Sequence, residues 1–323
     1  MVTKQHTTQE LADVNGLARR IATSLSQVLN GKPAAVESAI LTLLAGGHLL
    51  LEDVPGTGKT TLASALAGSI QADVRRIQFT ADMLPTDITG LSVYDQDSRE
   101  FRFHPGPIFT NIAIADEVNR ATPRAQSALL EAMAERAVTL DGKTRPLPRL
   151  FAVVATQNPQ DMEGTFPLPE AQRDRFMTRI ALGYPSNTAE VAMLTARGPG
   201  DPLDEVTPVA SIGQILAAQQ VIANIHISQE VSKYLVSIVS ATRTHPELSL
   251  GASPRATLHL ARMAQSRAAT RGRDFVSPDD IASLAEIVLP HRLSLSGRFA
   301  SVTEAHQAAT VVVAEIVSRT PVR

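Results

Sequence analysis

The segment from Asp53 to Thr60, with the sequence DVPGTGKT, carries residue types that bind phosphate. It lies between an apolar run, residues 48–51, and an Ala- and Leu-rich helical pattern that starts near Thr61. A glycine-rich loop between a strand and a helix exposes backbone N–H groups to an anion, and the helix N-terminus adds a positive partial charge. Lys59 can then reach the outer phosphates, and the Thr60 hydroxyl can ligate Mg²⁺. We therefore interpret the segment as a P-loop rather than as a chance glycine-rich turn, although Asp53 stands where the general pattern has Gly.

Two acidic residues could supply the chemistry of hydrolysis at a bound phosphate. Asp116 and Glu117 directly follow the run of residues 112–115, and the carboxyl end of a strand in an open parallel sheet faces the ligand. Hydrolysis needs a group that holds the metal and a group that positions water. We predict that Asp116 binds Mg²⁺, directly or through water, and that Glu117 is the general base. The alternative is an acidic cap of the following helix.

A third apolar run, residues 151–156, ends in Gln157, Asn158 and Pro159. Asn158 is a neutral polar group at the same predicted edge, where it could hold the water near the γ-phosphate; an ordinary Asn-Pro turn is the alternative. The predicted Mg²⁺ ligands are Thr60 and Asp116. The predicted nucleotide-binding residues are Asp53, Pro55, Gly56, Thr57, Gly58, Lys59, Thr60, Thr61 and Asp116.

A parallel sheet is needed to bring these groups together. Short apolar segments that alternate with helical patterns predict strands at residues 48–52, 74–79, 111–116, 150–156 and 179–182. Helical periodicity covers about residues 10–29 and stops at Asn30 and Gly31, and another helix follows Pro33. This alternation predicts an α/β fold with a parallel sheet covered by helices.

The second part of the chain has a different pattern. Residues 198–202, rich in Gly and Pro, are typical of a linker, and the pattern beyond is helical only. We predict an α/β nucleotide-binding core over residues 1–185, a linker over 186–209 and a smaller all-α lid domain over 210–323. Two hairpins are inserted in the core, at about residues 91–104 and 137–146, and are either solvated decorations or contacts with a substrate or partner.

Composition narrows the class of protein. The chain has 323 residues, 44% hydrophobic and 19% charged, no cysteine and a formal net charge of −2. The absence of cysteine excludes disulfides, thiolate metal sites and cysteine nucleophiles, and the charge does not suggest a nucleic-acid coat. Residues 1–13 are polar, and the longest apolar run, residues 39–51, is interrupted and shorter than the ~18 residues of a membrane span. We expect a cytoplasmic protein without membrane insertion.

In their order along the chain, the motifs resemble those of the AAA+ ATPases and, more closely, those of the MoxR family within them. The resemblance extends over roughly residues 25–295, and Asp at position 53 is usual for this family. It implies ATP and Mg²⁺ as cofactors. It is carried by residues 52–60, 77–80, 84–87, 116–120, 155–159, 167–172, 174–176 and 253–256.

The resemblance also implies roles for two arginines. Arg175 matches the arginine finger that reaches the ATP of a neighbouring subunit; Arg173, where an aliphatic residue is expected, is the second choice. A structural ion pair of Arg175 with Asp174 or Glu170 is the alternative. Arg255 matches the sensor arginine of the lid. It follows a Ser-Pro helix start, where a cation is unfavourable by helix-dipole logic alone, and this favours a ligand reason.

Further roles follow from the same resemblance. Gln78 or Thr80 would restrain Glu117 until a substrate arrives. Val28, Leu29 and the chain near residues 30–31 would contact adenine, although core packing explains the two apolar residues nearly as well. From their position after the two acids, and apart from the resemblance, Asn119 and Arg120 are expected either to contact a neighbouring subunit or simply to begin the helix.

For the whole protein, the resemblance implies a ring-shaped homo-oligomer, expected to be a hexamer. It would remodel client proteins, often partners with von Willebrand factor A domains, for metal-cofactor insertion or complex assembly. One alternative is a nucleic-acid motor or loader, which the lack of interleaved basic and aromatic residues disfavours. The other is a nucleotide-gated scaffold with little turnover, which should have a damaged Glu117 or finger.

Overall fold

A five-stranded parallel sheet forms the centre of the molecule in the computed structural model, which describes residues 7–29, 31–158, 164–188, 190–191 and 202–322. The strands are entirely parallel, as predicted, and the α/β fold class is confirmed. Their order is β10 (Thr178–Ile180), β1 (Leu49–Glu52), β9 (Ala152–Gln157), β6 (Ile112–Asp116) and β3 (Val74–Gln78). Every residue of β1, β6 and β9 is buried, because both faces of these strands are covered.

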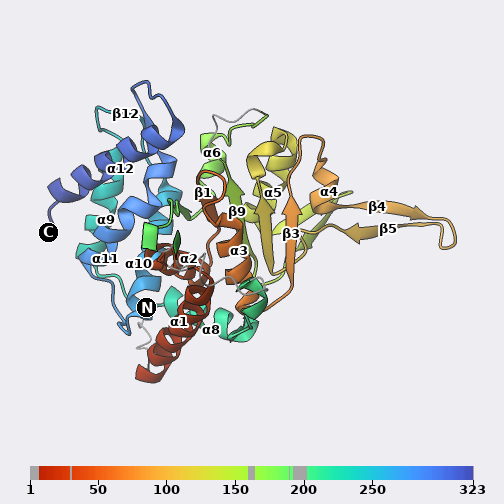
Figure 1. The fold of residues 1–323 in the computed structure, drawn as a ribbon, viewed down its shortest axis with the longest axis horizontal. Helices are drawn as coiled ribbons and strands as arrows, with labels where there is room; N and C mark the ends of the chain where they lie inside the picture. The colour runs from red at the N-terminus through yellow and green to blue at the C-terminus, as the bar shows by residue number, and fades with distance from the viewer. Residues whose placement is uncertain (1–6, 30, 159–163, 189, 192–201, 323) are drawn as a thin grey trace.

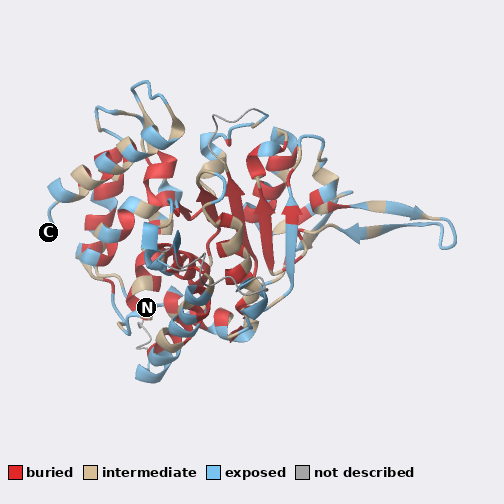
Figure 2. Cartoon of the chain, viewed as in Figure 1, coloured by how far each residue is buried: buried red, intermediate tan, exposed pale blue. Residues whose placement is uncertain are grey.

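The central strands are buried (Figure 2), and alternate residues along them belong to two different hydrophobic cores. Leu49 and Leu51 of β1 pack with α1 (Thr8–Val28), α2 (Pro33–Leu44) and α3 (Lys59–Gly68). Leu50 points to the opposite face and packs in the cluster that holds α4 (Pro85–Thr89) and α5 (Pro123–Glu135). The sheet is therefore the middle of three layers, and only the strand ends and the loops that follow them are free to bind a ligand.

The C-terminal part consists mainly of helices that lie beside the sheet layer (Figure 1). Ser253 caps α10 (Pro254–Thr270) by accepting a hydrogen bond from the Ala256 amide at 3.3 Å. The N-terminal helices pack onto this part, since the Ser266 hydroxyl of α10 donates to the Leu41 carbonyl of α2 at 3.0 Å. The helices are α8 (Ile212–Ala223), α9 (Gln229–Thr242), α10 (Pro254–Thr270), α11 (Pro278–Val288) and α12 (Val302–Arg319).

The expectation of helix only beyond the linker is wrong in detail. β11 (Ala210–Ser211) pairs in parallel with β2 (Ile70–Gln71), and β12 (Leu248–Leu250) forms an antiparallel ladder with β13 (Ser294–Leu295). These strands have two or three residues each, too few for a pattern of alternation. The structure also describes three 3₁₀ helices and one short α-helix: η1 (Val118–Arg120), α6 (Glu170–Arg173), η2 (Pro202–Glu205) and η3 (Pro290–Arg292).

Two antiparallel hairpins occupy the segments where inserted hairpins are predicted. β4 (Gly90–Asp95) and β5 (Glu100–Pro105) form a long ribbon that projects from the body (Figure 1), with the Phe101 side chain at its far end 73% exposed. β7 (Ala137–Leu140) and β8 (Lys143–Pro146) form the shorter one. Asp141 and Gly142, at its turn, both have positive φ (53° and 70°), the conformation of a tight hairpin turn.

Two predicted breaks fall partly or wholly outside the described residues: the helix stop at Asn30 and the linker-like residues 198–201. Among the helices that the structure describes, none combines the length and apolar character needed to cross a membrane.

A buried histidine, His48, ties three elements together just before β1. Its Nδ1 accepts a hydrogen bond from the Val153 amide at 3.0 Å, and its Nε2 lies 3.3 Å from the Met133 carbonyl oxygen. The neutral ring with its proton on Nε2 satisfies both partners. Burial and, less strongly, the Arg136 charge lower the pKa of His48 from 6.5 to about 4.

This shift makes stability depend on pH. The unfolded chain takes up a proton near pH 6.5 and the native chain only near 4, so the contribution of His48 to stability is present above about pH 6.5 and is lost as the pH falls toward 4. The slope is at most about 1.4 kcal/mol per pH unit. We expect His48→Asn to flatten the fall in the free energy of unfolding over this interval, measured by urea denaturation. Equal slopes in wild type and His48→Asn would contradict the assignment.

Candidate active site

The P-loop connects β1, which ends at Glu52, to α3, which begins at Lys59. Gly56 and Gly58 have φ of 82° and 92°, in the left-handed region that side chains with a Cβ rarely adopt. Gly58 is also the N-cap of α3. The two glycines therefore let the loop turn tightly so that its amides and the start of α3 face one space.

Lys59 lies in this loop with its side chain tucked beneath it. The residue is only 7% exposed, and its ammonium donates hydrogen bonds to the carbonyls of Asp53 at 2.7 Å and Val54 at 2.8 Å. Burial lowers the pKa of Lys59 below its usual value, while nearby carboxylates, that of Asp53 first, oppose the shift. The cation is thus positioned by backbone carbonyls of the loop itself.

Asp116 stands at the carboxyl end of β6, as predicted, and meets Thr60. Its Oδ1 accepts hydrogen bonds from the Thr60 hydroxyl at 3.2 Å and from the Thr156 hydroxyl at 2.5 Å. Its Oδ2 lies 2.5 Å from a guanidinium nitrogen of Arg76. The structure therefore brings the two predicted Mg²⁺ ligands together.

The donor set suits Mg²⁺. Thr60 and Asp116 offer hard oxygen ligands, and Mg²⁺ commonly uses one or two protein ligands together with water and substrate phosphates. Within the described part of the chain no group of three or more His, Cys, Asp or Glu residues is placed to hold a metal. The arrangement thus fits an ion that arrives with a phosphate ligand.

Glu117 has an unusual backbone and several hydrogen-bond donors around its carboxylate. Its φ and ψ are 55° and 47°, left-handed values that cost a residue with a side chain about 1–2 kcal/mol. Its Oε2 accepts from Gln78 at 3.0 Å and from Arg120 at 2.9 Å, and its Oε1 accepts from Asn158 at 3.3 Å. Such strain is typical of functional positions.

These contacts distinguish between residues that the sequence alone offers as equal candidates. Of the two candidates for restraining Glu117, Gln78 contacts it, whereas the Thr80 hydroxyl donates to Asp82 at 2.6 Å. Arg120 pairs with Glu117 inside the same subunit. Asn119 donates to the carbonyl of Asn158 at 2.9 Å and so ties the two strand ends together.

One cavity of about 590 Å³ collects these groups. Val28 and Leu29, the predicted adenine contacts, line it, whereas Asn30 lies outside the described residues. Asp53 is not part of the lining; its carboxylate accepts hydrogen bonds from the amides of Val54 at 2.8 Å and Gly183 at 2.6 Å. The lining also includes Lys32, Pro55, Gly56, Thr57, Gly58, Lys59, Thr60, Thr61, Arg76, Gln78, Asp116, Glu117, Thr156, Asn158 and Pro185.

Arg76, Thr156 and Lys32 are lining residues that sequence reasoning missed. Thr156 is the last residue of a predicted strand and lies two residues before Asn158, so its position in the sequence could have indicated that it lines the site. Arg76 needed the pairing of β3 with β6, which only the folded sheet provides. Lys32 reaches the cavity because its ammonium binds the carbonyls of Leu182, Gly183 and Tyr184, far along the chain.

Arg175 and Arg255 are not brought to the P-loop cavity of their own chain. Both line a separate cavity of about 180 Å³, together with Arg136. His48 and His259 also line it and are neutral, because burial lowers their pKa values to about 4 and about 2. No acidic residue lines this space in the described part of the chain, so it is cationic.

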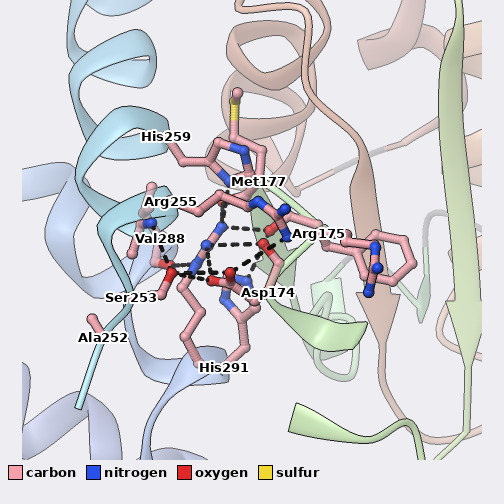
Figure 3. A network of polar contacts seen from close by, with 12 residues as sticks. Asp174, Arg175, Met177, Ala252, Ser253, Arg255, His259, Val288 and His291 are labelled. Atoms are coloured by element: carbon pink, nitrogen blue, oxygen red, sulfur yellow. Dashed lines mark hydrogen bonds and ion pairs between the residues drawn. The ribbon is translucent and has the colours of Figure 1, made fainter. Parts of the chain in front are cut away.

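Asp174, the residue before Arg175, faces the C-terminal helices and lies close to Arg255 of α10 (Figure 3). Its carboxylate accepts from the Ser253 hydroxyl at 2.9 Å and from Arg292 at 2.6 Å, and Arg255 lies 3.6 Å away. No ion pair joins Arg175 to Asp174 or Glu170, all three of which the structure describes; Arg175 donates instead to the Ala171 carbonyl at 3.1 Å.

Arg173, the second-choice finger, lines a third cavity with Glu52 and Arg179. Burial lowers its pKa, with the carboxylates of Glu52 and Glu170 acting in the opposite direction. Glu52 and Arg179 form a buried ion pair at 2.6 Å. Arg173 and Arg175 therefore face different spaces, although only one residue separates them.

Comparison with known proteins assigns both parts of the chain to known domain families. Residues 48–178 match the model of the "ATPase family associated with various cellular activities (AAA)", and residues 240–314 match an AAA lid domain. YeaC of Bacillus subtilis is 46% identical over 283 residues, 88% of each chain. Chaperone MoxR1 of Mycobacterium tuberculosis is 42% identical over 88% of this chain and 77% of its own.

More distant relatives agree. Protein MoxR of Paracoccus denitrificans is 30% identical over 88% of this chain and 91% of its own. Among solved structures, that of a provisionally assigned ATPase from Cytophaga hutchinsonii superposes with a TM-score of 0.83 at 35% identity, covering 97% of this chain and 96% of the other.

Proposed function

Because this chain belongs to the MoxR family of AAA+ ATPases, we propose that it hydrolyses ATP in a Mg²⁺-dependent reaction and uses the energy to remodel partner proteins. The observation that carries the proposal is the single cavity of about 590 Å³ in which the P-loop, Asp116, Glu117 and Asn158 meet. A phosphate-binding loop, a metal-binding acid and a base are the parts that phosphoryl transfer to water requires.

The residues divide the work as follows. The P-loop amides and Lys59 hold the phosphates, and Thr60 and Asp116 hold Mg²⁺. When bound, Mg²⁺ neutralises charge that develops on the phosphate oxygens. Glu117 takes a proton from the attacking water, and Asn158, whose side-chain amide already lies 3.3 Å from Glu117, orients that water.

Glu117 is restrained in this arrangement. Gln78 and Arg120 both donate to the same carboxylate oxygen, Oε2, at 3.0 and 2.9 Å. Both donors occupy the oxygen that would accept a proton from water, so we propose that hydrolysis requires these donors to release Glu117. Gln78 is then the residue that restrains the base until a substrate arrives.

We propose that the active site is completed by a second subunit in a ring, expected to be a hexamer. The support is the cationic cavity that Arg136, Arg175 and Arg255 line apart from the P-loop, which offers a surface for the phosphates of a neighbour's ATP. In this arrangement both Arg175 and Arg255 act on the adjacent subunit. Residues 1–185, 186–209 and 210–323 would then serve as core, linker and lid.

We propose that the client is a protein, in line with the name of the relative chaperone MoxR1. Partners with von Willebrand factor A domains, metal-cofactor insertion and complex assembly are the forms of this role that the family resemblance suggests. The projecting β4–β5 hairpin, with Tyr94 and Phe101 stacked edge to face at 5.4 Å, is the proposed contact.

Replacing Lys59 tests nucleotide binding. Lys59→Ala removes one charge-assisted contact to phosphate, and such contacts contribute about 1.5–3 kcal/mol, so affinity for ATP should fall roughly ten- to hundredfold. Isothermal titration with a non-hydrolysable ATP analogue measures this. Lys143→Ala, in the exposed hairpin strand β8, is the control and should bind normally. Unchanged affinity for the analogue in Lys59→Ala would contradict the assignment of the P-loop.

A further inference from the structure

The edge strand β3 places a cation on the metal-binding acid. A guanidinium nitrogen of Arg76 lies 2.5 Å from Oδ2 of Asp116. The side chain of Asp116 is 6% exposed and that of Arg76 is 57% exposed. The ion pair therefore joins a fixed, buried carboxylate to a long side chain that has open space to move into.

The register of β3 against β6 explains why this residue reaches the acid. Arg76 is opposite Ile114 and Gln78 is opposite Asp116, in a parallel pair. Side chains two positions apart in a strand share one face, and from this face of β3 Arg76 contacts Asp116 while Gln78 contacts Glu117. Arg76 also donates to the Gln78 side-chain oxygen at 3.2 Å, and Gln78 donates to Glu117.

The charge balance of the site gives this contact a role. Lys59, a second cation nearby, donates its hydrogen bonds to two backbone carbonyls. Oδ1 of Asp116 accepts hydrogen bonds from two hydroxyls, those of Thr60 and Thr156. The only hydroxyl near Oδ2 among the described residues is that of Thr60, at 3.5 Å. Arg76 therefore neutralises the oxygen that has the weaker hydroxyl contacts. A divalent cation on the same carboxylate would repel the guanidinium across a short distance.

We propose that Arg76 is an internal counter-cation that stabilises Asp116 in the metal-free protein and competes with Mg²⁺ for it. Arrival of Mg²⁺ with the nucleotide displaces Arg76 and with it the hydrogen bond to Gln78, the residue that holds Glu117. This inference rests on the proposed function. It makes Arg76 a positioning residue that sets how strongly ATP binding depends on Mg²⁺.

The experiment compares the affinity of a non-hydrolysable ATP analogue in EDTA with that in Mg²⁺, by isothermal titration. The ratio of the two dissociation constants is the Mg²⁺ enhancement. Arg76→Gln loses the competitor of Mg²⁺ and leaves an unneutralised carboxylate that repels metal-free nucleotide. Both effects raise the Mg²⁺ enhancement. We expect a rise of about tenfold, because the free energy of this half-exposed ion pair should lie between that of an exposed ion pair and that of a buried charged hydrogen bond.

Three further proteins make the test specific. Arg76→Lys keeps the charge and should stay within about threefold of wild type. Arg75→Gln is the matched control: it changes the neighbouring arginine on the opposite face of β3, whose distance to Asp73 is 3.9 Å. In an Asp116→Asn background, Arg76→Gln should have almost no effect, because the partner of the cation is already gone.

An enhancement in Arg76→Gln equal to that of wild type would overturn the inference. A lower one would overturn it as well, because Arg76 would then assist metal or phosphate binding instead of competing. Wild-type protein that binds the analogue in neither buffer would contradict the proposed function itself, and the inference with it. The two failures are distinct, since one is seen in wild type and the other only in the variant.

Discussion

Arg175→Ala should bind ATP nearly as tightly as wild type and hydrolyse it far more slowly. Arginine fingers accelerate hydrolysis roughly 10³- to 10⁵-fold in well-studied nucleotide hydrolases, and we expect a loss of that order or smaller here. Arg175 lies outside the P-loop cavity of its own chain and beside Arg255. Removing it should therefore leave the binding of nucleotide intact while lowering the turnover that a neighbouring subunit performs.

A mixing experiment separates action on the neighbour from action within one chain. Arg175→Ala and Lys59→Ala subunits each retain the half-site that the other lacks, so mixing them should restore part of the activity. Wild-type activity per subunit should also rise with protein concentration as assembly completes the sites. Arg173→Ala is the matched control, because Arg173 faces a different cavity and should leave most of the rate.

Two outcomes would contradict this picture. Rates that stay constant on dilution to a demonstrated monomer, without rescue on mixing, would show that no finger is supplied by a neighbour. A loss of rate in Arg173→Ala with normal rates in Arg175→Ala would exchange the roles of the two arginines.

Glu117→Gln should keep ATP and Mg²⁺ bound while turnover falls by about 10²–10⁴-fold, the usual range for a positioned general base. The change removes the basic oxygen and the negative charge but keeps the size of the side chain. It leaves the P-loop and the two metal ligands, Thr60 and Asp116, untouched. Single-turnover kinetics beside an equilibrium binding measurement separates the two effects.

Two further variants serve as comparisons for Glu117→Gln. Glu135→Gln, an exposed carboxylate at the end of α5, should turn over normally. Asp116→Asn should instead raise the Mg²⁺ concentration needed for activity. Normal turnover in Glu117→Gln would reduce Glu117 to a residue that only ends β6. If turnover is lost as expected, the ATP-bound variant is also suited to capture a client protein.

The sequence predicted the central sheet and the P-loop because their signals are local. A short apolar run followed by glycines, lysine and threonine needs no distant partner to be interpreted, and Asp116 and Glu117 directly follow a strand that is recognisable by itself. Parallel pairing then brings all strand ends to one edge, so the sequence pattern alone is enough to predict Asn158 near Glu117.

The rest of the site depends on register and on long-range packing. Whether Gln78 or Thr80 meets Glu117 is decided by the register of β3 against β6, which a single sequence does not specify. The cationic cavity of Arg175 and Arg255 requires that segments about eighty residues apart come together, and no periodic pattern encodes that. The short strands β11, β12 and β13 likewise form only because the chain elsewhere offers an edge.

The carboxylate of Asp174 has a consequence for how subunits communicate. It is bound by Ser253 at the start of α10 and by Arg292 of η3, while the next residue in the chain is Arg175. Arg292 also donates to the carbonyls of Phe176 and Met177, so the backbone on both sides of Arg175 is fastened to the C-terminal helices. Any rotation of those helices must therefore carry Arg175 with it. In a ring, the conformation of one subunit would then control when its neighbour hydrolyses ATP. ATP turnover would therefore be cooperative, with a Hill coefficient above one, instead of independent at each site.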